Sequence, residues 1–130
     1  MLASNTKNEK PMKKTLVIGA STNPERYAYK AAQRLLENGH EIELLGLRRG
    51  EIFGKSIDTE KKQYPDIDTV TLYVGPKNQP EYYDYILSLH PKRVVFNPGT
   101  ENPEFEALLE ANGIQAQEAC TLVLLSTQQY

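Results

Sequence analysis

One segment of the chain places hydroxyl, amide and guanidinium groups directly after a short apolar run, which is the arrangement of an anion-binding turn. Backbone N–H groups and the positive dipole end at the start of a helix attract phosphate groups. Ser21 or Asn23 would also cap the helix that follows. We therefore predict an anion site in this segment. Its candidate residues are Gly19, Ala20, Ser21, Thr22, Asn23, Pro24 and Arg26.

The glycine spacing of this turn departs from that of a dinucleotide-binding fold. A Gly-x-Gly-x-x-Gly fingerprint would also need glycine where Ser21 and Pro24 stand. The acid that binds ribose hydroxyls is absent as well, because the next apolar run ends in Leu47, Arg48 and Arg49. NAD is therefore disfavoured at both places. The two arginines suit an additional phosphate on the adenosine ribose, as in NADP or coenzyme A (CoA), or they form a solvated loop.

The single cysteine, Cys120, is the strongest candidate for covalent chemistry. One cysteine excludes an internal disulfide and a cysteine-rich zinc cage, and two histidines are too few for a typical zinc site, so we predict no metal. A thiolate at Cys120 would allow acyl transfer or a mixed disulfide, whereas the alternative is a small packed apolar residue. The sequence places neither His40 nor His90 beside Cys120 as a base. This pattern favours a protein without a catalytic constellation.

The composition of the 130-residue chain is that of an ordinary globular protein, with 39% hydrophobic and 25% charged residues. A formal net charge of -2 argues against non-specific nucleic-acid binding, because no strong positive field is available. Apolar runs such as Leu122–Leu125 are far shorter than a membrane span, and the first residues lack the apolar core of a signal peptide. We expect a cytoplasmic protein that binds neither nucleic acid nor membrane.

Apolar runs and periodic segments alternate along the chain and predict alternating strands and helices. The predicted strands cover residues 14–20, 41–47, 68–75, 92–99 and 114–119, with one short further strand near 55–58. The predicted helices begin at Pro24, Asn78 and Asn102, and Asn102 caps the last of them. The type of the segment 120–126 is left open. Residues 1–12 are predicted to be a disordered arm before a single domain over 13–130.

This alternation predicts an α/β fold, a single Rossmann-like doubly wound parallel sheet of about five strands in the order 3-2-1-4-5, with helices on both faces. Ligands of such sheets bind beyond the carboxyl ends of the strands, where the strand order reverses. Four of the five turns there contain glycine, which either admits a ligand closely or only meets the needs of a tight strand end. The further candidate residues at these ends are Leu47, Arg48, Arg49, Val74, Gly75, Pro76, Asn97, Pro98, Gly99 and Cys120.

The segment VIGASTNPERYAYKAAQRLLENGHEI resembles the small stand-alone CoA-binding domain proteins (the CoA_binding_2 type), which are relatives of the CoA-binding domain of the succinyl-CoA synthetase α subunit. The shared residues are Gly19-Ala20-Ser21, Pro24, Arg26 and Tyr29. The resemblance continues through NPGTENPEFEALLEANGI to EACTLVLLST, and it spans about residues 13–127. Many members carry Asn-Pro after the second strand, where this chain has Leu47 and Arg48.

The resemblance implies CoA as the ligand, with its pyrophosphate at the Gly19–Ser21 turn and its adenosine along the ends of the second and third strands. We therefore expect a CoA-binding or acyl-CoA-binding protein that is non-catalytic or regulatory. Two alternatives stay open. The first is an enzyme, either an NADP-dependent reductase or an acyl-transfer enzyme that uses Cys120. The second is an interaction module, for which the tyrosines at 82, 83 and 85 would supply a surface.

Overall fold

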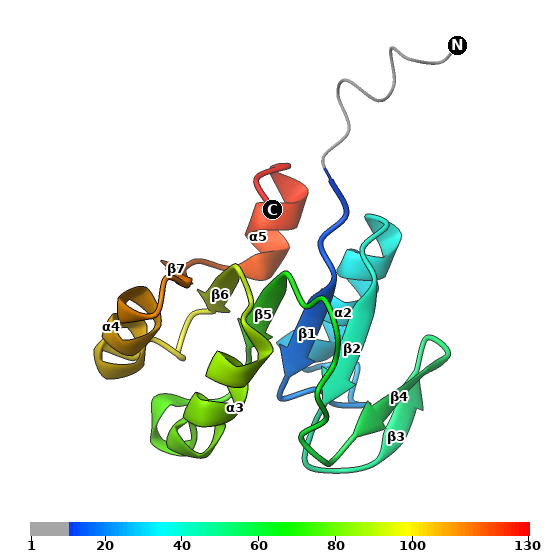
Figure 1. The fold of residues 1–130 in the computed structure, drawn as a ribbon. Coiled ribbons are helices and arrows are strands. Elements are labelled where there is room, and N and C mark those ends of the chain that lie inside the picture. The colour runs from blue at the N-terminus through cyan, green and yellow to red at the C-terminus, as the bar shows by residue number, and fades with distance from the viewer. Residues whose placement is uncertain (1–10) are drawn as a thin grey trace.

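The structure, a computed structural model, describes residues 11–130, so the predicted arm over residues 1–12 lies outside the described residues except for its last two (Figure 1). The strands are β1 (Thr15–Ile18), β2 (Ile42–Leu45), β3 (Gly50–Ile52), β4 (Lys55–Asp58), β5 (Thr69–Leu72), β6 (Arg93–Phe96) and β7 (Gln115–Glu118). The helices are α2 (Tyr27–Glu37), α3 (Tyr83–Leu89), α4 (Pro103–Ala111) and α5 (Thr121–Ser126), with two 3-10 turns, η1 (Pro76–Asn78) and η2 (Pro80–Tyr82). No helix within residues 11–130 is long and apolar enough to cross a membrane.

The described strands form one seven-stranded sheet in the order β3-β4-β2-β1-β5-β6-β7, in which only the β3–β4 hairpin is antiparallel. The α/β class and the mostly parallel sheet are confirmed, but the predicted count of about five strands and their order were wrong. The prediction took β5 as the third strand and placed it outside β2, whereas β5 pairs with β1. β4 stands beside β2 instead, with Leu44 opposite Ile57. Because Ile57 is the only apolar residue of β4, this strand carries almost no periodic signal.

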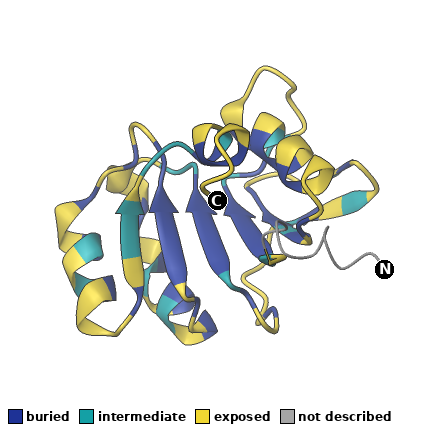
Figure 2. Cartoon of the chain, turned by 90° about the horizontal axis from the view of Figure 1, so that it is seen from above, coloured by how far each residue is buried: buried dark blue, intermediate teal, exposed yellow. Residues whose placement is uncertain are grey.

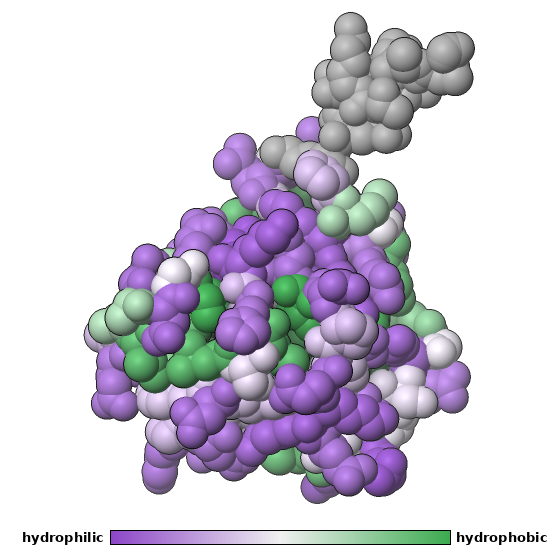
Figure 3. Space-filling view, viewed as in Figure 1, coloured by the Kyte–Doolittle hydropathy of each residue, from purple (hydrophilic) through white to green (hydrophobic). Residues whose placement is uncertain are grey.

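The central strands of the sheet are buried on both faces, as is usual in a parallel sheet. Successive side chains point to opposite faces, so Leu16 and Ile18 join the core with α3 and α4, while Val17 joins the core with α2 and α5. β1, β5 and β6 are buried along their whole length, and β7 is a polar edge strand (Figure 2). On the side of α3 and α4, a band of apolar surface is framed by polar side chains (Figure 3).

Of the three predicted helix starts, the one at Asn102 is confirmed, whereas α3 begins at Tyr83 instead of Asn78. Asn102 caps α4 as expected, because its side-chain oxygen accepts a hydrogen bond from the Phe105 N–H at 3.1 Å. α2 begins at Tyr27, three residues later than predicted, and its N-cap is Arg26 without a side-chain cap. The intervening residues form a separate turn, closed by a 3.0 Å hydrogen bond from the Arg26 N–H to the Asn23 carbonyl. The prediction that Ser21 or Asn23 caps this helix was therefore wrong.

His40 lies at the amino edge of the sheet and is buried, with 7% of its surface exposed. Its Nδ1 accepts a hydrogen bond from the Lys13 backbone N–H at 2.9 Å, and its ring lies 5.0 Å from that of Tyr130. Burial, and then the charges of Lys13 and Arg93, hold the pKa of His40 below its ordinary value, against a smaller opposing effect of Asp68. The folded chain therefore binds a proton at this imidazole less readily than the unfolded chain does.

This burial predicts a specific acid sensitivity. As the pH falls below about 6.5, His40 takes up a proton in the unfolded chain before it does so in the folded chain, so the free energy of unfolding decreases. One such proton changes it by at most about 1.4 kcal/mol per pH unit. Urea unfolding at pH 7.5 and pH 5.5 should show a smaller loss for His40→Gln than for the unmodified chain. Equal losses in the two proteins would contradict the assignment.

Candidate ligand-binding site

The turns that follow the parallel strands lie side by side along one edge of the sheet. Ile18 at the end of β1 stands opposite Leu45 and Leu72, and Phe96 stands opposite Leu72 and Glu118. The chain runs outward from β1 through β2 to β4 and then crosses to β5 on the other side of β1. The reversal between β1 and β5 marks the position where ligands of such sheets bind.

The turn after β1 has free backbone amides at two of its predicted residues. The N–H groups of Gly19 and Ala20 both donate to the Leu45 carbonyl, at 2.9 and 3.0 Å, so they shape the turn. The Ser21 side chain accepts a hydrogen bond from the Asn23 N–H at 3.0 Å. Within the described residues, the N–H groups of Ser21 and Thr22 have no hydrogen-bond partner. Within this turn, the amides available to an anion are therefore those of Ser21 and Thr22, ahead of the start of α2.

The glycines at this end of the sheet let segments of backbone approach one another. Gly19 has a φ of +98°, and a Cβ there would lie 2.7 Å from the Tyr73 carbonyl oxygen. A Cβ on Gly46 would lie 2.4 Å from the Ala20 carbonyl oxygen. At these two positions, the packing of neighbouring turns explains the glycine without any ligand. Gly75 and Gly99 differ, because no atom lies within 4 Å of a Cβ placed on either.

The cationic and aromatic residues predicted around this turn are spread out. Arg26 is exposed at the start of α2, while the Tyr29 ring packs 5.0 Å from that of Phe53 in the β3–β4 hairpin. Arg49 pairs with Glu60, with 3.9 Å between Nη2 and Oε1, and Arg48 is exposed beside it. The Arg26 backbone thus closes the turn that holds the free amides, while Tyr29 and Arg49 are used in other contacts. Pro24 is exposed in the turn before α2.

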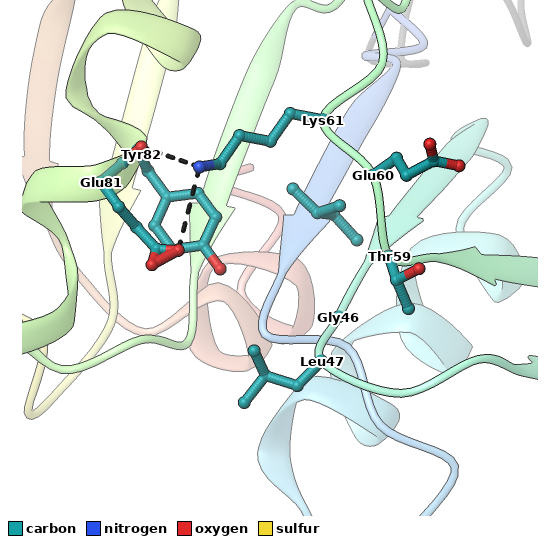
Figure 4. Close-up of a pocket in the computed structure, with 8 residues that line it drawn as sticks. Gly46, Leu47, Thr59, Glu60, Lys61, Glu81 and Tyr82 are labelled. Atoms are coloured by element: carbon teal, nitrogen blue, oxygen red, sulfur yellow. Dashed lines mark hydrogen bonds and ion pairs between the residues drawn. The ribbon is translucent and has the colours of Figure 1, made fainter.

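A cleft of about 360 Å³ opens beside this turn, between the ends of β2 and β4 and the η2 turn (Figure 4). Gly46 and Leu47 connect it to the turn after β1, because Gly46 touches Ala20. Leu47, which is 87% exposed, and Tyr82 supply apolar surface to the cleft, and polar side chains supply the rest of its lining. Its lining residues are Leu45, Gly46, Leu47, Thr59, Glu60, Lys61, Glu81 and Tyr82.

Sequence reasoning found Leu47 in this cleft but missed Thr59, Glu60, Lys61, Glu81 and Tyr82 as site residues. One signal was available. The short strand suspected near residues 55–58 is β4, and its carboxyl end leads directly into the lining segment 59–61. If β4 had been included among the predicted parallel strands, residues 59–61 after its carboxyl end would have been predicted at the ligand-binding edge of the sheet. The η2 residues carry no comparable signal, since only the packing of the polypeptide brings them to the cleft.

The turns after β5 and β6 are held by buried polar side chains. Asn97 is 2% exposed, and its Nδ2 donates to Thr71 Oγ1 at 2.7 Å and to the Leu72 carbonyl at 2.8 Å. Its Oδ1 accepts a hydrogen bond from the Thr121 N–H at 2.8 Å. These bonds fix the start of α5 against β5 and β6. Asn97 is therefore a buried residue that holds these turns in place. The other residues predicted in these turns are exposed or half-buried: Gly75, Pro76, Pro98 and Gly99 are exposed, and Val74 is half-buried.

Cys120 is half-buried between β7 and α5. Its neighbour Thr121 donates to or accepts from Thr71 Oγ1 at 2.8 Å, which places this junction over β5, next to β1. Burial raises the pKa of Tyr73, against smaller opposing effects of the Thr121 and Thr71 side chains, so this phenol stays protonated. His40 and His90 precede β2 and β6 and so lie at the amino edge, away from Cys120.

The far end of this edge is acidic. The Glu106 carboxylate, which accepts a hydrogen bond from the protonated form of Glu118, and the negative charges of Glu106 and Glu101 raise the pKa of Glu118, at the end of β7. Glu101 also accepts the Gly99 N–H at 2.9 Å. These carboxylates repel a phosphate at this end of the edge. Among residues 11–130, no group of three or more His, Cys, Asp or Glu side chains is placed to hold a metal ion.

The family model of the CoA binding domain matches residues 13–126. The chain belongs to the CoA-binding domain family. This membership confirms the resemblance carried by Gly19, Pro24, Arg26 and Tyr29, and it supports CoA binding in general.

Solved structures share the fold of this CoA-binding domain. An uncharacterized protein is 52% identical with a TM-score of 0.92, and the match covers 93% of this chain and 100% of that chain. A hypothetical protein from Pyrococcus horikoshii OT3 is 26% identical with a TM-score of 0.82, covering 95% and 89%. A Thermus thermophilus protein, cell-free ID.343, is 24% identical with a TM-score of 0.80, covering 92% and 91%, and shows the fold alone. No curated protein matches the chain significantly.

Proposed function

We propose that this CoA-binding domain holds CoA or acyl-CoA without a catalytic step of its own and acts as a regulatory binding protein. The observation that carries the proposal is the pair of free amides at Ser21 and Thr22 in the turn beside a cleft with mixed polar and apolar lining. A pyrophosphate needs the amides, and a nucleoside needs the cleft. The two features are adjacent because Gly46 in the cleft touches Ala20 in the turn.

In this arrangement the pyrophosphate binds the Ser21 and Thr22 amides, with the Arg26 guanidinium as a further donor. The adenosine enters the cleft between Leu47 and Tyr82. The pantetheine arm then runs from the turn after β1 past the exposed turn after β5 toward Cys120. The acidic end at Glu118 keeps the phosphates on the β1 and β2 side of the edge.

Within residues 11–130, no histidine lies beside Cys120, and this supports the non-catalytic part of the proposal. A cysteine nucleophile is usually activated by a neighbouring base or cation. Both histidines lie at the other edge of the sheet, and the nearby Tyr73 is held in its neutral form. An acyl-CoA would therefore bind with its thioester near Cys120 and leave unchanged. The test is to incubate the protein with acetyl-CoA and to measure the mass of the chain by mass spectrometry. An acetyl group transferred to the chain would contradict this part of the proposal.

Replacing Arg26 with alanine should weaken CoA binding about tenfold, because a charge-assisted hydrogen bond to phosphate is lost. Isothermal calorimetry with CoA, acetyl-CoA, NAD and NADP measures this directly. The NAD arm is needed because Glu60 supplies the cleft with a carboxylate that could bind ribose hydroxyls. Arg34→Ala is the matched control, since Arg34 is an exposed arginine at the other end of α2.

The control should bind CoA as the unmodified chain does. Equal affinity of Arg26→Ala and Arg34→Ala for CoA would remove Arg26 from the site. Binding of NADP with no response to CoA would overturn the proposed ligand and favour the reductase alternative.

A further inference from the structure

One side chain crosses the cleft and ties its two walls together. Lys61 leaves the segment after β4 and reaches η2, where its Nζ donates to the Glu81 carbonyl oxygen at 3.0 Å (Figure 4). The same Nζ lies 3.8 Å from the Glu81 carboxylate and 4.9 Å from the centre of the Tyr82 ring. Among the described residues that line the cleft, Lys61 is the one cation.

The contact between Lys61 and Glu81 is easily exchanged. Their side chains are 39% and 60% exposed, and ion pairs of this kind stabilise a protein very little. Arg49, which the sequence suggests for an additional ribose phosphate, is already paired with Glu60 and does not line the cleft. An anion that enters the cleft therefore meets the Lys61 ammonium group, the cation of its described lining.

We propose that Lys61 recognises the 3′-phosphate of CoA and that Glu81 competes with this phosphate for the Lys61 ammonium group. This inference rests on the proposed function, which places the adenosine in the cleft. A phosphate monoester carries nearly two negative charges at neutral pH and accepts several hydrogen bonds, so it replaces a single, solvated carboxylate. Dephospho-CoA, which lacks that phosphate, leaves the contact between Lys61 and Glu81 in place. The pair thus makes the cleft selective for the phosphorylated nucleoside.

Calorimetry with CoA and dephospho-CoA tests the selectivity separately from binding. The unmodified chain should prefer CoA, and Lys61→Met should reduce this preference about tenfold while affinity for dephospho-CoA changes little. Lys61→Arg should keep most of the preference. Glu81→Gln should strengthen binding of CoA severalfold, because the competing carboxylate is removed.

Lys62→Met is the matched control, because Lys62 is the neighbouring lysine and pairs with Asp58 at 3.0 Å instead of lining the cleft. It should retain the full preference for CoA, and thermal unfolding should confirm that each variant is folded. Loss of the preference in Lys61→Met alone supports the inference. An unchanged preference in that variant, or equal binding of both ligands by the unmodified chain, overturns the inference while CoA binding stands. Binding of neither ligand overturns the proposed function and this inference together.

Discussion

Replacing Gly46 with alanine is expected to destabilise the fold by about 3 kcal/mol, one of the largest effects of any single methyl group in this chain. The added Cβ would lie 2.4 Å from the Ala20 carbonyl oxygen and 3.0 Å from Ile57 Cγ2. Neither the β1 turn nor β2 can move away freely, because the Gly19 and Ala20 N–H groups are bonded to the Leu45 carbonyl. The overlap therefore separates the anion-binding turn from the cleft, and CoA binding should be lost as well.

Alanine substitutions at two other glycines distinguish the cost of steric overlap from the cost of an unfavourable backbone conformation. Gly75→Ala adds a methyl group where no atom lies within 4 Å and φ is not positive, so its unfolding free energy should stay within about 0.5 kcal/mol of the unmodified value. Gly54→Ala has the same open space but a φ of +77°, so it measures the conformational cost alone, about 1 kcal/mol. Urea unfolding compares the three variants. If Gly46→Ala is as stable as Gly75→Ala, the two backbone segments do not pack as described.

Replacing Asn97 with leucine is expected to cost about 4 kcal/mol, because three buried hydrogen bonds are lost at once. The Thr121 N–H loses its acceptor, and Thr71 Oγ1 and the Leu72 carbonyl lose their donor. All of these groups are shielded from water, so no solvent replaces the missing partner. Because the start of α5 depends on Asn97, the environment of Cys120 should change in the same variant.

Asn112→Leu is the matched control for this substitution. Asn112 is exposed after α4, and its side chain donates only to the Leu108 carbonyl at 2.8 Å. Its loss should cost less than about 1 kcal/mol. Urea unfolding gives the stabilities, and the rate of modification of Cys120 by a thiol reagent reports on the junction between β7 and α5. Similar costs at the two asparagines would mean that Asn97 does not hold this junction.

The sequence predicts the parts of the fold that depend on local patterns. The runs at β1, β5 and β6 are apolar and rich in branched residues because both faces of each strand are buried, so their strands were recognised. The cap at Asn102 followed from residue type and position alone. The strand order could not be predicted from local patterns, because β4 contains only one buried apolar residue, Ile57. In the structure, β4 pairs with β2 at the place where the prediction had put β5.

The part of the candidate site that lies in one continuous segment was predictable from the sequence, whereas the contacts between segments distant in sequence were not. The turn with Ser21 and Arg26 is a single segment, and its ability to bind an anion follows from its composition. Lys61 and Tyr82 meet only because two elements distant in sequence pack against each other, and no local pattern contains that contact. The role of Gly46 was also out of reach, because a glycine that admits a ligand and one that admits Ala20 look identical in the sequence.

The central claim is that one continuous site, made of the turn after β1 and the adjoining cleft, binds CoA. Amide chemical shifts recorded during a CoA titration test it most directly. We predict that the largest shifts occur at Ser21, Thr22, Leu47 and Lys61, with amides near His40 unchanged at the opposite edge. Shifts centred on the amino edge, or no shifts at millimolar CoA, would contradict the account.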